Sequence, residues 1–191
     1  LAQLTEEQIK SYLLHLVSKE KVSASTYNLH VQALRFFYRI VLDKPISRHF
    51  LPRMKQNIKI PDILSASEVA QIIKSAHNIK QRMMFVVAYG AGLRVSEIAH
   101  LKVKDIDSKR MVLHIRNGKG GKDRYAVLSP TVLEMLRTYW QKCRSKIKSQ
   151  GNWVFPGRDI HKPITIRAIQ IAFMQTKIRA GITKSGGIHS L

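Results

Sequence analysis

Two helix-start patterns, sixty residues apart, constrain the fold of this chain more than any other feature. Thr5 with Gln8, and Ser65 with Glu68, each match the capping box, in which two side chains bond reciprocally to the free N–H groups of a helix start. Apolar residues then recur at helical spacing: Ile9, Leu13, Leu14 and Val17 after the first box, and Val69, Ile72 and Ile73 after the second. The chain is therefore expected to contain two helical regions, each opened by its own cap.

A proline-containing stretch, residues 44–64, separates these two regions. Its three prolines stand among basic residues, which predicts a linker that carries at most a short helix. We therefore expect a helical domain over residues 1–60 and a second domain over residues 61–191, with the linker running across the boundary between them.

Further helices are expected from apolar spacing and from the residues that begin and end them. In chain order they run from about Ser25 to Pro45, over 83–92, from a cap at Ser96 to Leu101, from Pro130 onward, and over 164–178. The first of them has an apolar stripe made of Leu29, Val31, Leu34, Phe37, Tyr38 and Val41. Helices are thus expected to account for most of the chain.

Two short apolar runs, Met111–Ile115 and Tyr125–Leu128, differ from this pattern. They flank a glycine-rich turn that contains Asn117-Gly118, a pair typical of tight turns between antiparallel strands. Asp105 and Asp107, which come just before, are expected to be turn residues. The expected fold class is mainly α, with a small antiparallel β-sheet or hairpin in the second domain.

The chain carries a large positive charge: 33 Lys and Arg against 12 Asp and Glu give a formal net charge of +21. Basic residues are interleaved with apolar ones, so the charge is expected on folded surfaces that contact a polyanion, with nucleic acid as the first candidate. A ribosomal or membrane-surface protein would also fit this composition. No apolar run is long enough for a transmembrane helix, no signal-peptide pattern opens the sequence, and the lone Cys143 favours a reducing, cytoplasmic setting.

Arg94 and Glu97 stand where a helix that ends near Gly92 meets the start of the next helix. A guanidinium at a helix start, beside free backbone N–H groups, can bind a phosphate through two hydrogen bonds. Glu97 could pair with a neighbouring base or brace the turn. An ordinary surface arginine in a cap motif is the alternative that these residues leave open.

Two further positions could take part in chemistry. Lys119 lies on the turn between the two apolar runs, where it can donate a proton if cationic neighbours lower its pKa; a solvated turn is the alternative. His189 follows a Gly186-Gly187 pair near the end of the sequence. The sequence contains no metal-binding pattern of clustered His, Cys and carboxylate residues, and its glycines and lysines do not match a nucleotide-binding Walker loop.

In this order the pieces resemble the tyrosine recombinases, the family of lambda-type phage integrases and Xer-like recombinases. In the second domain the resemblance rests on Ala91-Gly92-Leu93-Arg94-Val95-Ser96-Glu97-Ile98, on Leu101 with Asp105-Ile106, on Gly118-Lys119-Gly120 with Lys122 and Arg124, and on His189-Ser190-Leu191. In the first domain Thr26-Tyr27 and Leu34-Arg35-Phe36-Phe37-Tyr38 are similar to the family's core-binding domain. The resemblance covers nearly the whole chain.

The resemblance implies a role for each matching residue. Arg94 would clamp the scissile phosphate, Lys119 would be the general acid for the departing 5′-hydroxyl, and His189 would begin a His-x-x-Arg motif, with Glu97 as a supporting carboxylate. A tyrosine would attack the phosphodiester and form a 3′-phosphotyrosyl link, without a metal or a nucleotide cofactor. The partner would be double-stranded DNA, contacted by basic residues of the linker and the hairpin: Arg48, Arg53, Lys55, Lys59, Lys122 and Arg124.

The intact protein would act as a tetramer on two DNA sites in the bacterial cytoplasm, at the nucleoid. The match stops at Leu191, one residue before the second arginine of the motif, and no tyrosine follows. We therefore expect a truncated recombinase that lacks its nucleophile and is inactive, with an active intact parent. A catalytically inactive DNA-binding fragment or degenerate recombinase is the alternative, and a generic RNA-binding protein is a weaker third.

Overall fold

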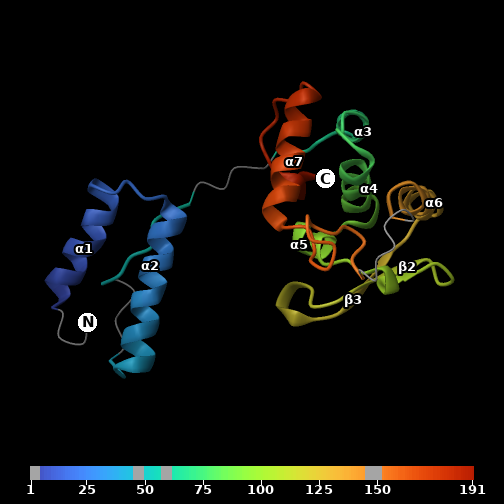
Figure 1. The fold of residues 1–191 in the computed structure, drawn as a ribbon. Coiled ribbons are helices and arrows are strands. Elements are labelled where there is room, and N and C mark those ends of the chain that lie inside the picture. Colours follow the sequence, from blue (N-terminus) through green and yellow to red (C-terminus); the bar gives the residue numbers. More distant parts are fainter. Residues whose placement is uncertain (1–4, 45–49, 57–61, 145–151) are drawn as a thin grey trace. The chain divides into compact units, whose positions relative to one another are not determined.

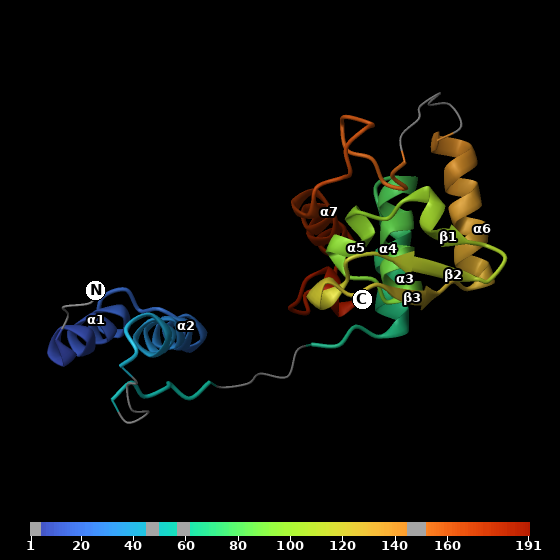
Figure 2. The same cartoon turned by 90° about the horizontal axis from the view of Figure 1, so that it is seen from below.

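The computed structural model describes residues 5–44, 50–56, 62–144 and 152–191, with the backbone alone for Lys119 and Arg144. The chain divides into two compact units, Leu1–Ile60 and Pro61–Leu191, which we call the N-terminal and C-terminal units. Figures 1 and 2 show both units. Within the described residues, no helix is long and apolar enough to cross a membrane.

The described part of the N-terminal unit contains two α-helices, α1 (Glu6–Ser18) and α2 (Ala24–Phe36), and α2 continues into a π-helical turn over Phe37–Val41. The predicted capping box of α1 is confirmed: the Thr5 hydroxyl accepts from the N–H of Gln8, whose side chain accepts from the N–H of Thr5. The core of the unit consists of Ile9, Leu13, Leu16, Tyr27, Val31, Tyr38 and Leu51.

The apolar face of α2 differs from the predicted stripe. Leu29 is 69% exposed and Val41 is 61% exposed, so the prediction is wrong at these two positions. The buried side chains are instead Tyr27, Val31 and Tyr38, whose spacing of four and seven residues places them on one helical face. Leu29 lies off that face because it is only two residues from each of its buried neighbours.

The segment of residues 50–54, which follows the π-helical turn in the chain, also contacts α2. Pro45, the predicted end of the helix, lies outside the described residues. Leu51, expected within the linker, is fully buried in the core of the unit, and Phe50 packs against that core. The Asn28 side chain donates to the carbonyl of Met54 and accepts from its N–H, both at 2.9 Å. These contacts tie the chain to α2 as far as residue 54.

Five α-helices and a three-stranded sheet form the described part of the C-terminal unit. The helices are α3 (Ala66–Lys74), α4 (Ile79–Ala91), α5 (Val95–Ala99), α6 (Pro130–Tyr139) and α7 (Ile166–Arg179). The strands are β1 (Ile106–Asp107), β2 (Val112–Ile115) and β3 (Arg124–Val127), antiparallel in the order β1-β2-β3. Short 3-10 turns lie at Val103–Asp105, Lys119–Gly121 and Ile188–Ser190, and a π-helical turn at Trp140–Arg144. The predicted fold class, mainly α with a small antiparallel sheet, is confirmed.

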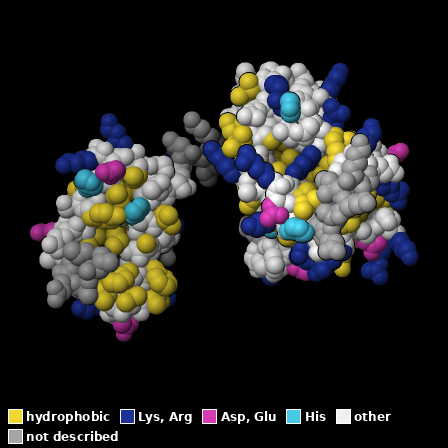
Figure 3. Space-filling model, in the orientation of Figure 1, with side chains coloured by type: hydrophobic (Ala, Val, Ile, Leu, Met, Phe, Trp, Pro, Cys, Tyr) yellow, Lys and Arg dark blue, Asp and Glu magenta, His cyan; other side chains and the backbone are white. Residues whose placement is uncertain are grey.

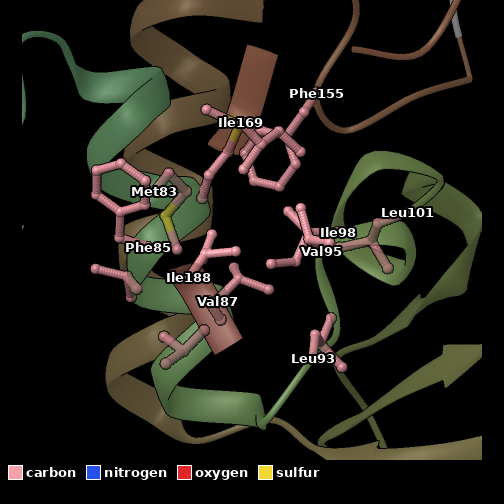
Figure 4. Packing of buried hydrophobic residues seen from close by; sticks show 14 of the residues in the cluster. Met83, Phe85, Val87, Leu93, Val95, Ile98, Leu101, Phe155, Ile169 and Ile188 are labelled. Atoms are coloured by element: carbon pink, nitrogen blue, oxygen red, sulfur yellow. The ribbon is translucent and has the colours of Figure 1, made fainter. Parts of the chain in front are cut away.

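Helix α4 is the centre of the C-terminal unit. In Figures 1 and 2 it lies between α7 and α6, and α3 packs beside it. Residues 83–88 are all buried, which is expected for a helix surrounded by other elements. They share one core with buried residues of α3, α5, α6 and α7, part of which Figure 4 shows. Phe85 and Phe173 meet there edge to face, with ring centroids 5.5 Å apart.

The sheet has one strand more than the predicted hairpin. The turn prediction for Asp107 is wrong for its backbone, which pairs with β2 as part of β1. Asp105 does lie in a turn, at the end of the 3-10 turn Val103–Asp105, but its side chain is buried. Its side chain is 3% exposed and its Oδ1 accepts from Nε of Arg116 at 2.8 Å. Such a short strand is set by pairing with β2, which apolar periodicity over two residues cannot reveal.

Candidate active site

Arg94 is presented by the junction between α4 and α5. Gly92 ends α4 in the left-handed region (φ +60°), which glycine adopts without steric cost. Leu93 is buried in the core, and Arg94 then adopts an extended backbone ahead of the first turn of α5. The predicted cap at Ser96 is wrong: Arg94 takes the cap position, and its N–H donates to Oε2 of Glu97 at 2.9 Å.

The Glu97 carboxylate joins two guanidinium groups. Its side chain is 4% exposed; Oε1 accepts from Nη1 of Arg94 and Oε2 from Nη2 of Arg124, each at 2.8 Å. The side chains of Arg94 and Arg124 are 46% and 37% exposed, so part of each guanidinium stays open to solvent. One buried carboxylate thus fixes two exposed cations at one place on the surface, which suits an anionic ligand with several oxygens.

These hydrogen bonds also set the ionisation of Glu97. Burial raises the pKa of the carboxyl, but the hydrogen bonds from the N–H of Arg94 and from the Arg124 and Arg94 side chains outweigh burial. The pKa therefore lies below its ordinary value of 4.5. Glu97 is ionised at neutral pH and acts as a fixed counter-charge, not as a proton donor.

The hairpin that carries Lys119 comes close to Glu97. The N–H of Gly118 donates to the carbonyl of Lys122 at 2.9 Å and closes the turn. A Cβ added to Gly118 would lie 2.9 Å from that carbonyl and 3.5 Å from Oε1 of Glu97. The backbone at Gly118 therefore runs directly beside the carboxylate, and Lys119 is the next residue along the chain.

His189 lies on the 3-10 turn at Ile188–Ser190 and is exposed. Ile188 is buried in the same cluster as Leu93, and both are labelled in Figure 4. Arg94 directly follows Leu93, and His189 directly follows Ile188. Both residues are therefore anchored, through their neighbours, to the same hydrophobic core. Among the described side chains, no hydrogen bond or ion pair joins His189 to Arg94.

The segment before this turn is clamped to the start of the C-terminal unit. Ser185 donates to Oδ2 of Asp62 from its N–H at 2.8 Å and from its hydroxyl at 2.7 Å. Lys184 donates to Oε2 of Glu68, the capping-box residue of α3, at 2.7 Å. Hydrogen bonds from Ser185 lower the pKa of Asp62, and the hydrogen bond from Lys184 lowers the pKa of Glu68. No sequence pattern indicated these pairs, which join residues more than a hundred positions apart.

The C-terminal unit is expected to lose stability in acid. The pKa values of Glu97, Asp62 and Glu68 are lower folded than unfolded, so their contribution is full above the unfolded values of 4.5 and 3.8 and is lost as pH falls through the folded ones. Urea unfolding should show constant stability from pH 7 to about 5 and a decline below about 4.5. Both tryptophans of the chain, Trp140 and Trp153, lie in this unit, so their fluorescence reports its unfolding alone. Asp62→Asn should flatten the acid limb; an unchanged slope would contradict the assignment.

The structure describes four of the six residues predicted to contact DNA. Three are exposed: Arg53 and Lys55 in the N-terminal unit and Lys122 on the hairpin. Arg124 is bound to Glu97 beside Arg94, a position that the sequence analysis did not anticipate. Arg48 and Lys59 lie outside the described residues. Figure 3 shows many Lys and Arg and few acidic side chains on the visible face of the C-terminal unit.

A metal site is not apparent in the part of the chain that the structure describes, where no three His, Cys, Asp or Glu side chains gather. The site is therefore a cluster of cations around one carboxylate. Its chemistry, as far as these side chains define it, is the binding of an anion by guanidinium groups.

Comparison with known proteins gives this cluster a family context. The model described as "Phage integrase family" matches residues 62–191, and the model described as "Phage integrase, N-terminal SAM-like domain" matches residues 1–48. The provisionally named integrase/recombinase y4qK of Sinorhizobium fredii is 37% identical over 189 residues, which cover 98% of this chain and 60% of that protein. The chain therefore spans less than two thirds of this relative.

Solved structures share the fold. The crystal structure of the XerA recombinase superposes with a TM-score of 0.60 at 26% identity, covering 99% of this chain and 66% of that one. A lambda integrase, solved as a tetramer bound to a Holliday junction, gives a TM-score of 0.75 at 18% identity, covering 100% and 58%. With a family model over most of its length and a relative at this identity, the chain belongs to the phage integrase family of tyrosine recombinases.

Proposed function

We propose that the intact protein is a site-specific recombinase that cuts and rejoins double-stranded DNA through a 3′-phosphotyrosyl intermediate. The observation that carries this proposal is the buried carboxylate of Glu97, which holds the guanidinium groups of Arg94 and Arg124 beside the Lys119 hairpin. Fixed cations of this kind stabilise a phosphodiester whose charge grows in the transition state. Since the chain spans 60% of its relative y4qK, the activity is assigned to the parent protein.

Each residue then has a role at the scissile phosphate. Arg94 donates two N–H groups to its non-bridging oxygens. Lys119 protonates the departing 5′-oxygen, and His189 acts as a phosphate ligand and acid or base. Glu97 does not touch DNA and keeps Arg94 in place. The proposed scheme uses neither a metal nor a nucleotide cofactor.

We assign the nucleophilic tyrosine to a part of the parent protein that follows Leu191. The tyrosines of this chain all precede His189, whereas the family's nucleophile follows the His-x-x-Arg motif. Three of them, Tyr27, Tyr38 and Tyr139, are also buried and so cannot reach a phosphodiester in the folded state. The 191-residue chain is therefore proposed to bind DNA without completing strand cleavage.

We assign a different role in recombination to each of the two units. Residues 1–60 would clamp the duplex, with Arg53 and Lys55 on phosphates together with Arg48 and Lys59 of the flanking sequence. Residues 61–191 would bring the reacting groups to the DNA. The lambda integrase relative forms a tetramer on a Holliday junction, and we propose a tetramer for the intact parent, acting on DNA in the bacterial cytoplasm. Binding through many phosphates should weaken steeply with salt.

The test uses the full-length parent protein with suicide substrates made from the DNA that flanks its gene. In such a substrate a nick beside the cleavage site lets the released fragment diffuse away, so the covalent intermediate accumulates. We expect a protein–DNA adduct that survives denaturation and is linked through a tyrosine absent from this chain. A parent that binds these duplexes and never forms the adduct would support the inactive DNA-binding alternative.

Lys119→Ala in the full-length parent is expected to slow cleavage by about 10²–10⁴-fold, the usual contribution of a positioned general acid. A substrate with a 5′-phosphorothiolate should restore most of the rate, because the sulfur leaves without a proton. Single-turnover rates with both substrates measure this difference. Lys109→Ala, an exposed lysine of the β1–β2 turn, is the matched control and should leave both rates nearly unchanged. Without sulfur rescue, Lys119 is not the acid.

A further inference from the structure

Asp123 stands at the base of the loop that carries Lys119. Its Oδ1 accepts a hydrogen bond from the N–H of Asn117 at 2.9 Å, and its Oδ2 lies 3.1 Å from Nε2 of His114. Asn117 and Asp123 are the two residues that flank the five-residue segment containing Lys119. The Asp123 side chain therefore closes this loop from one end to the other.

The loop needs such a closure because its backbone is strained at the entry. Asn117 has a φ of +50°, a left-handed conformation that a residue other than glycine adopts only at a cost in free energy. Gly120 and Gly121 are also left-handed, at φ +77° and +73°. Within the loop, Gly118 adds two backbone hydrogen bonds: its N–H donates to the carbonyl of Lys122, and its carbonyl accepts from the N–H of Gly121. The Asn117–Asp123 bond thus holds the turn at its most strained residue.

His114 fixes the other side of the Asp123 carboxylate. Its ring stacks on Tyr125, the opposite residue of β3, with centroids 5.0 Å apart. Arg116 also lies near Asp123, but its Nε is bound to Asp105. The hydrogen bond from Asn117 lowers the pKa of Asp123, with help from His114, so the carboxylate is ionised at neutral pH. His114 of β2 thus contacts one oxygen of the carboxylate, and Asn117 at the start of the loop donates to the other.

We propose that Asp123 is a positioning residue for Lys119, acting through the backbone of Asn117 to hold the loop in the conformation that delivers the lysine to the leaving oxygen. The inference rests on the proposed function, because it assumes that Lys119 is the acid. Asp123 itself touches neither DNA nor the reacting atoms. The chemistry it controls is one proton transfer, so its loss should imitate the loss of the acid and spare the other steps.

The first arm of the test uses the 191-residue chain and needs no activity. Asp123→Ala should speed hydrogen exchange at the Asn117 amide by about tenfold or more, because the amide loses its acceptor. Asp123→Asn keeps one carbonyl oxygen for that amide and should stay close to wild type. Asp107→Ala is the matched control, since Asp107 accepts from the N–H groups of Lys109 and Arg110 in the β1–β2 turn. It should leave exchange at Asn117 unchanged.

The second arm measures cleavage by the full-length parent. Asp123→Ala should lower the single-turnover rate on the oxygen substrate by about 10- to 100-fold, the cost of a slightly misplaced catalytic group. The 5′-phosphorothiolate substrate should recover that loss, whereas Asp123→Asn and Asp107→Ala should cleave both substrates at nearly the wild-type rate. This pattern separates positioning of the acid from a general loss of structure.

The possible outcomes test the positioning role of Asp123 and the recombinase proposal separately. An equal loss on the oxygen and sulfur substrates, or unchanged exchange at Asn117 in Asp123→Ala, overturns the positioning role while the recombinase proposal stands. A wild-type parent that forms no adduct overturns the proposed function, and the role of Asp123 falls with it. Rescue by sulfur together with faster exchange supports both.

Discussion

Arg94→Ala in the full-length parent is expected to abolish the covalent protein–DNA adduct and to leave duplex binding within a few-fold of wild type. The guanidinium is half exposed and fixed by Glu97 on one side, so it is ready to donate to a phosphate without further ordering. Loss of one fixed donor costs about 10²–10³-fold in rate, and loss of a transition-state arginine as much as 10³–10⁵-fold. Binding changes little because one phosphate contact among many is lost.

Two comparisons make the Arg94 result specific. Arg110→Ala removes the same charge from an arginine that is 79% exposed on the β1–β2 turn, and it should cleave normally. Arg94→Lys keeps the charge but loses the planar pair of donors, so it should recover only a small part of the rate. Normal cleavage by Arg94→Ala would overturn the assignment of the site, and equal loss in Arg110→Ala would point to net charge instead.

Local sequence patterns predicted those parts of the fold that depend on neighbours along the chain. The capping boxes at Thr5 and Ser65 satisfy helix N–H groups within four residues, and both are present. Pro130 begins α6, as its missing N–H allows. The β2–β3 hairpin forms around its predicted turn. In these cases the energetics are decided inside one short stretch, so composition and order are enough.

One error has a local cause: Ser96 is the better cap by residue type, but Glu97, three residues after Arg94, accepts from both the N–H and the guanidinium of Arg94, which takes the cap position. The other errors arise where a partner distant in sequence decides the outcome. Leu29 fits a helical stripe but lies off the face that meets the rest of the unit. Arg124 reaches the site through the pairing of β3 with β2, which brings it to a carboxylate 27 positions earlier. Tertiary contacts of this kind leave no local pattern.

If Glu97 both stabilises the fold and positions Arg94, as we propose, one substitution can separate the two roles. Glu97→Gln keeps the shape of the side chain and replaces an acceptor by an NH₂ group that faces donors. Arg94 and Arg124 are then left without a counter-charge beside a position that is 4% exposed. Breaking a buried ion pair costs about 3–5 kcal/mol, and the exposure of both arginines reduces this, so we expect a loss of about 2–3 kcal/mol. Urea unfolding followed by the fluorescence of Trp140 and Trp153 measures it in the 191-residue chain.

The same variant should also cleave slowly under conditions where it is fully folded. A guanidinium that has lost its carboxylate must be ordered by the phosphate itself, so the rate falls although Arg94 is present. Glu134→Gln, an exposed glutamate of α6, should change neither stability nor rate. If Glu97→Gln is destabilised but cleaves as fast as wild type when folded, the carboxylate serves the fold alone and Arg94 is ordered by DNA. If both properties fall together, one buried charge holds the junction of α4 and α5 and aims the arginine that this junction presents.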